Sequence, residues 1–81
     1  MKKDEITTIL IKYIKKEFTR DSEVEIVAET DLFASGILDS LGLMKLIRFI
    51  EATFDNPVPL IDILPENFSS VRNISLYLTN A

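Results

Sequence analysis

Apolar residues near the start of the chain recur at steps of three and four. This spacing places them on one face of an amphipathic helix, which we predict to run from about Asp4 to Phe18. The opposite face is polar and basic. The apolar face holds Ile6, Ile9, Leu10, Tyr13, Ile14 and Phe18, and the polar face holds Lys12, Lys15 and Lys16.

The segment from Thr19 to Leu38 lacks this periodicity. Within the stretch EVEIVAE, apolar Val24 and Ile26 alternate with glutamates, as they would in a strand. No other stretch offers a partner strand, and a lone strand leaves its backbone groups unpaired, so we predict an extended loop. Gly36 gives the backbone freedom just before the next helix. The apolar anchors that would pack this loop down are Leu32, Phe33, Ile37 and Leu38.

A second helix is predicted to begin at Asp39 or Ser40, because both are favourable N-cap residues. It should end near Asp55 and Asn56, because the following Pro57 cannot continue a helix. Its spacing again predicts one buried face. That face is formed by Leu43, Leu46, Ile47, Ile50 and Phe54.

The rest of the chain has room for one short helical element and one longer helix. Leu60 to Leu64 can form only a helical turn or two before Pro65, and Phe68 then supplies an apolar anchor. A last helix follows, capped by Ser69 or Ser70, with Val71, Ile74, Tyr77 and Leu78 facing inward. The sequence therefore predicts an all-α fold. It is a small four-helix bundle, three helices long and one short, with a long loop between the first two.

Composition supports one folded domain, which we expect to span residues 1–81. Apolar residues make up 47% of the 81 residues, more than a disordered chain of this size would contain. The predicted core joins Ile6, Leu10, Ile14, Leu32, Leu46, Ile47, Ile50, Phe54, Phe68, Val71 and Ile74. The sequence has no cysteine and no histidine, which excludes a disulfide scaffold and removes the usual ligands of a structural zinc site. The N-terminus lacks the features of a signal peptide, and no apolar run approaches the length of a transmembrane helix, so we expect a cytoplasmic monomer.

The net charge of −4 is unevenly distributed. The first twenty residues carry six basic and three acidic side chains, whereas the remainder carries three basic and ten acidic ones. The acidic body would repel phosphates, so we do not expect nucleic-acid binding. The basic first helix could touch a membrane surface, but we favour the simpler interpretation, a solvated helix face.

The stretch GILDSLGL raises the question of chemistry, because the polar pair Asp39 and Ser40 interrupts an apolar run. Ser40 has no histidine to activate it, and Lys45 lies on a different side of the same helix, so catalysis by this chain is disfavoured. One interpretation is a plain helix cap. The other is a modified serine, because the positive end of a helix stabilises an added phosphate and Asp39 could help the modifying enzyme orient a metal–nucleotide substrate.

The segment DLFASGILDSLGLMKLIRFIEATF resembles the phosphopantetheine-bearing part of acyl and peptidyl carrier proteins. Asp39-Ser40-Leu41 is similar to the Asp-Ser-Leu attachment motif of that family, and Gly36-Ile37-Leu38 to its lead-in. Asp31-Leu32-Phe33 resembles the preceding loop anchor. Phe54, Val58, Pro59 and the later PENFSSVRNI resemble the elements that follow the second helix, so the likeness covers nearly the whole chain.

This resemblance implies a carrier and not an enzyme. Ser40 would receive 4′-phosphopantetheine from coenzyme A through a phosphodiester, with Asp39 recognised by the modifying enzyme. The thiol of that arm would hold an acyl or aminoacyl group as a thioester. The implied partners are a phosphopantetheinyl transferase, an adenylating ligase and downstream acyl-transfer enzymes.

The residues after Ser40 indicate which kind of carrier this is. Carriers of fatty acid synthesis have a strongly acidic second helix, whereas this chain has Gly42 where that type usually has an acid. The run is more similar to stand-alone aminoacyl carriers such as D-alanyl carrier proteins. We predict an aminoacyl carrier with a docking patch for partner enzymes formed by Leu41, Met44, Lys45 and Arg48. The alternatives are a specialised fatty-acyl or polyketide-type acyl carrier protein and, more distantly, an unmodified helical interaction module in which Ser40 is only a cap.

Overall fold

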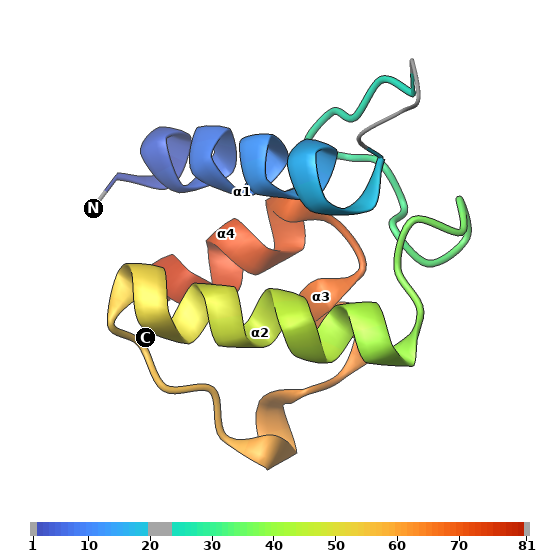
Figure 1. Cartoon of the computed structure of the whole chain (residues 1–81). Coiled ribbons are helices and arrows are strands. Elements are labelled where there is room, and N and C mark those ends of the chain that lie inside the picture. Colours follow the sequence, from blue (N-terminus) through green and yellow to red (C-terminus); the bar gives the residue numbers. More distant parts are fainter. Residues whose placement is uncertain (1, 20–23, 81) are drawn as a thin grey trace.

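The computed structural model of the chain describes residues 2–19 and 24–80, which are helical with intervening loops and contain no strand (Figure 1). Three longer helices are present, as predicted: α1 (Lys3–Phe18), α2 (Ser40–Phe54) and α4 (Val71–Thr79). A 3₁₀ turn, η1 (Leu60–Asp62), and a four-residue helix, α3 (Pro65–Phe68), lie between α2 and α4. The predicted all-α bundle is therefore confirmed. None of the helices within the described ranges is long and apolar enough to cross a membrane.

The core lies where the three longer helices meet. Figure 1 shows α1 and α2 running alongside each other, with α4 crossing between them. Phe54 is the one predicted core residue that is only half-buried, because it is the last residue of α2. The predicted core residues that are buried are Ile6, Leu10, Ile14, Leu32, Leu46, Ile47, Ile50, Phe68, Val71 and Ile74. Beside this core, the rings of Tyr13 and Phe49 stack with centroids 3.8 Å apart and join α1 to α2.

Side-chain caps explain where the helices begin and end. The Asp39 carboxylate accepts a 2.7 Å hydrogen bond from the Gly42 amide, so Asp39 is the N-cap and Ser40 the first residue of α2. Asp55 ends α2 in the left-handed conformation, with φ 49°. At α4 the hydroxyl of Ser70 accepts from the Asn73 amide at 3.1 Å, which identifies Ser70 as the cap.

The connection between α2 and α4 contains more helix than the sequence predicted. The expected helical turn within Leu60 to Leu64 is present as η1, but a separate short helix, α3, begins at Pro65. Proline is tolerated at the first position of a helix, because its missing N–H would have no intrahelical partner there. The sequence analysis used Pro65 only as a stop signal and therefore missed α3.

The long loop before α2 is held by backbone hydrogen bonds to the α3–α4 junction. The Leu32 amide donates to the Ser69 carbonyl at 2.7 Å, and the Arg72 amide donates to the Ala28 carbonyl at 2.9 Å. Residues 24–26 form no strand, as predicted, and the part of the predicted loop at residues 20–23 lies outside the described residues. Three buried apolar residues absent from the predicted core lie in loops: Ile26, Leu38 and Val58.

Candidate functional site

Ser40 lies where the long loop enters α2, and two features of the loop fix its position. Leu32 and Leu38 are both buried, and the Leu38 amide donates to the Leu32 carbonyl at 2.9 Å. Between them Gly36 has φ 81°, a left-handed conformation that favours glycine. The loop that precedes Asp39 is therefore held in place by buried residues, whereas Ser40 itself is exposed to solvent.

The first turn of α2 is suited to hold a negatively charged group on Ser40. The Ser40 hydroxyl and the backbone amides of Ser40 and Leu41 make no hydrogen bond to any residue that the structure describes. The first turn also contains no acidic residue. Free N–H groups at the positive end of a 15-residue helix stabilise a phosphate, so this position favours an acidic modification of the hydroxyl.

Gly42 is the buried residue of this turn, a feature that the sequence analysis missed. A Cβ atom at Gly42 would lie 3.1 Å from Oδ1 of Asp39 and 3.2 Å from Cε1 of Phe18. It would also lie 3.5 Å from Cδ2 of Leu38. The sequence identified Gly42 only as a position without an acid, whereas the structure shows a glycine packed between the end of α1 and the cap of α2. No sequence pattern predicts this contact, because it depends on how α1 and α2 pack against each other.

The four predicted docking residues share one exposed face of α2 beside Ser40. Met44 and Lys45 lie three and four residues after Leu41, and Arg48 lies four and three residues after Met44 and Lys45, which places the four residues in neighbouring turns. Leu41 is 73% exposed and Met44 45% exposed. Lys45 and Arg48 are also exposed, and neither forms an ion pair with any described residue. The face combines an apolar centre with a basic edge, which is a surface that a partner with apolar and acidic groups would match.

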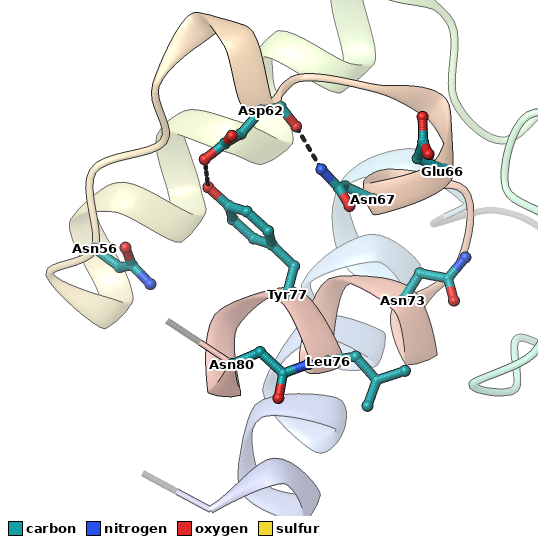
Figure 2. A pocket seen from close by; sticks show the side chains of 8 residues that line it. All are labelled: Asn56, Asp62, Glu66, Asn67, Asn73, Leu76, Tyr77 and Asn80. Carbon is teal, nitrogen blue, oxygen red and sulfur yellow. Dashed lines mark hydrogen bonds between the residues drawn. The ribbon is translucent and has the colours of Figure 1, made fainter.

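A recess lies away from these residues, between η1, α3 and α4 (Figure 2). It has a volume of about 470 Å³ and is lined mainly by residues with polar side chains, none of which is a predicted site residue. The Tyr77 hydroxyl donates to Oδ2 of Asp62 at 2.7 Å across it, and the Asn67 side chain donates to the Asp62 carbonyl at 2.9 Å. Burial, the hydrogen bond with Asp62 and the charge of that carboxylate raise the pKa of Tyr77 to about 12. These bonds hold η1 against α3 and α4.

Comparison with known proteins gives three further findings. A family model described as "Phosphopantetheine attachment site" matches residues 8–78. The D-alanyl carrier protein of Streptococcus pyogenes serotype M5 (strain Manfredo) is 33% identical over 69 residues, which is 85% of this chain and 85% of that protein. Two solved structures share the fold. One is a chain from a crystal structure of a Bradyrhizobium japonicum glycine:carrier protein ligase, complexed with its cognate carrier protein and an analogue of glycyl adenylate. It matches with a TM-score of 0.74 and 23% sequence identity, and the match covers 98% of this chain and 97% of that one. The other, described as an FAD-dependent dehydrogenase, has a TM-score of 0.78 at 24% identity, over 86% of this chain and 99% of that one.

Proposed function

This chain belongs to the phosphopantetheine attachment-site family and is a carrier protein, and from this premise we propose that Ser40 bears the 4′-phosphopantetheine arm and that the cargo is an aminoacyl group. Members of the family are substrates of other enzymes and not catalysts. The observation that carries the proposal is the exposed Ser40 hydroxyl, which has no hydrogen bond to any described residue and lies at the N-terminus of α2 within the Asp-Ser-Leu motif.

The residues present fit the attachment of this arm. The Ser40 oxygen would form a bond to the phosphorus that carries the pantetheine, and the phosphoanhydride bond of coenzyme A would break. The adenosine bisphosphate half would leave, and a base of the transferase would take the hydroxyl proton. The free amides of Ser40 and Leu41 then face the new phosphodiester charge. When bound, the arm supplies a thiol that holds the cargo as a thioester.

An aminoacyl cargo is supported by the 33% identity with a D-alanyl carrier protein over most of both chains. It is also supported by the surface of α2 after Ser40, where Lys45 and Arg48 are basic and Glu51 is the first acid, in contrast to the strongly acidic second helix expected for a fatty-acid carrier. An adenylating ligase would load the modified chain, and acyl-transfer enzymes would unload it. We propose that the protein works as a monomer in the cytoplasm.

Leu41, Met44, Lys45 and Arg48 form the docking surface for these enzymes in this proposal. Leu41 and Met44 expose apolar area beside the attachment point, where a partner must approach in any case. Lys45 and Arg48 form no ion pair with any described residue, so no contact within the described part of the chain accounts for two basic side chains here. Asp39, exposed beside Ser40 and fixed by its bond to the Gly42 amide, would be the residue that the phosphopantetheinyl transferase recognises.

The test is mass spectrometry of the purified protein after incubation with coenzyme A and a broad-specificity phosphopantetheinyl transferase. We expect one added phosphopantetheine on the parent and none on Ser40→Ala. The variant should stay folded, because the cap comes from Asp39 and not from Ser40. An addition that persists in Ser40→Ala would contradict Ser40 as the site, and no addition to the parent would favour an unmodified interaction module.

The modified parent would then be incubated with candidate adenylating ligases, ATP and a panel of amino acids and fatty acids. We expect an adduct with the mass of an amino acid. An adduct with a fatty acid alone would contradict the aminoacyl cargo while leaving the attachment site intact.

A further inference from the structure

The contact between Gly42 and Phe18 connects the end of α1 to the attachment motif. Gly42 is buried although both of its chain neighbours are at least partly exposed. A Cβ atom at this position would lie 3.1 Å from the Asp39 carboxylate and 3.2 Å from the Phe18 ring. Both separations are shorter than nine in ten real Cβ contacts. The volume that a side chain would need is therefore taken by the cap of α2 on one side and by α1 on the other.

The backbone gives no separate reason for glycine at this position. Gly42 lies within the first turn of α2, and its φ is not positive, so any L-residue could adopt its conformation. Glycine is also less favourable than alanine inside a helix. The close approach of Asp39 and Phe18 is the feature that glycine accommodates without any shift of these neighbours.

We propose that Gly42 is a positioning residue for the modification of Ser40, an inference that rests on the proposed function. Because Gly42 has no Cβ, Oδ1 of Asp39 can accept a 2.7 Å hydrogen bond from the Gly42 amide while the Phe18 ring packs against Gly42. This bond fixes the exposed Asp39 carboxylate beside the free Ser40 hydroxyl. Because Gly42 is buried, it does not touch the transferase and acts through Asp39.

The experiment measures kcat and KM for transfer of phosphopantetheine from coenzyme A to the unmodified parent, Gly42→Ala, Asp39→Asn and the double variant Asp39→Asn/Gly42→Ala. We expect Gly42→Ala to lower kcat about fivefold or more while KM stays within about twofold, because the docking face is unchanged. Its melting temperature should not fall, since the gain in helix propensity offsets crowding at the flexible end of Phe18. In the Asp39→Asn background, Gly42→Ala should lower kcat by less than about twofold. The Asp39 carboxylate, through which Gly42 acts, is already absent there.

A second pair of variants tests the role of Phe18. Phe18→Leu shortens the side chain beneath Gly42, so Phe18→Leu/Gly42→Ala should recover kcat to within about twofold of Phe18→Leu alone. If circular dichroism shows that Gly42→Ala does not fold, Phe18→Leu/Gly42→Ala replaces it in the test. This double variant must then fold, and its kcat must lie within about twofold of that of Phe18→Leu.

Three results would overturn the inference while leaving Ser40 as the attachment site: parent-like kcat in Gly42→Ala, an equal loss in the Asp39→Asn background, or no recovery with Phe18→Leu. A parent that is not modified at all, or modification of Ser40→Ala, would instead overturn the proposed function and this inference with it.

Discussion

Replacing Leu41 or Met44, the exposed apolar residues of α2, by alanine should lower the rate at which the modified carrier is loaded. The size of each effect should follow the exposed fraction of the side chain. Complete burial of a Leu or Met side chain contributes about 1.5–3 kcal/mol. Because Met44 is 45% exposed, a partner that covers it gains about 0.7–1.4 kcal/mol, and Met44→Ala should lower kcat/KM of loading about three- to tenfold. Leu41 is 73% exposed, so the corresponding loss for Leu41→Ala is about six- to fortyfold.

The assay uses proteins that already carry the arm, so that effects on attachment do not enter. The loading ligase supplies the activated cargo, and intact mass follows the rate, while a melting curve checks the stability of each variant. Leu60→Ala is the matched control, because Leu60 is 82% exposed but lies in η1. We expect its loading rate to equal that of the parent. A slow Leu60→Ala together with parent-like Leu41→Ala and Met44→Ala would move the docking surface from α2 to the η1 segment.

The basic edge of the same face should act mainly on association. Lys45 and Arg48 are exposed, so their attraction to an acidic partner is screened by salt. The double variant Lys45→Glu/Arg48→Glu should raise KM for the loading ligase at low ionic strength and should lose most of this effect at about 1 M salt. The same variant should be recognised better than the parent by enzymes that serve acidic fatty-acid carriers. Unchanged KM at low salt with both enzyme types would refute a role for these two charges.

Two further predictions concern the fold that presents the site. Ile50 and Ile47 are buried in the core, so Ile50→Ala and Ile47→Ala should each lower the free energy of unfolding in urea by about 2–5 kcal/mol, and losses below about 0.5 kcal/mol in both would show that the buried face is assigned wrongly. The pKa of Tyr77 is raised by burial and by the Asp62 hydrogen bond to about 12, so the unfolded chain loses this proton at lower pH than the folded one. Relative to Tyr77→Phe, the parent should therefore keep its full free energy of unfolding below about pH 10. As the pH rises to about 12, this free energy should fall by about 1 kcal/mol relative to the variant, allowing for the partial exposure of the ring. Free energies of unfolding in urea that run parallel for the two proteins across this range would contradict the prediction.

Periodicity and capping chemistry were sufficient to predict the longer helices. The spacing from Ile6 to Ile14 identified α1 and its buried face, and the prediction of its ends differs from the structure by one residue. For α2, Asp39 and Pro57 gave the beginning and the end because each acts locally, one as a cap and the other as a residue that cannot continue a helix. Signals of this kind depend only on neighbours in the sequence and can be recognised without a structure.

The features that the sequence did not predict depend on contacts between distant segments. Ile26 and Val58 are buried, but each lies in a loop outside the helices, where no helical periodicity reveals an inward face. The four-residue α3 is too short for a helical pattern, although Pro65 at its first position was an available signal. The burial of Gly42 follows from the approach of Phe18, which lies 24 positions earlier in the chain. Only the way in which α1 and α2 pack side by side determines this contact.

The packing of α1 against the first turn of α2 also bears on the charge of the proposed docking surface. The absence of an acid at position 42 looks in the sequence like a simple change of surface charge, but the structure makes it a matter of packing. A Cβ atom there would lie 3.1 Å from Oδ1 of Asp39 and 3.2 Å from Cε1 of Phe18, so any side chain requires these neighbours to shift by a few tenths of an ångström. Beyond Asp39 and Ser40, the first charged side chains of α2 are Lys45 and Arg48, which are both basic. If this face is the docking surface, as we propose, a partner that matches it carries apolar and acidic groups, and the basic side chains of α2 disfavour enzymes built to bind an acidic carrier.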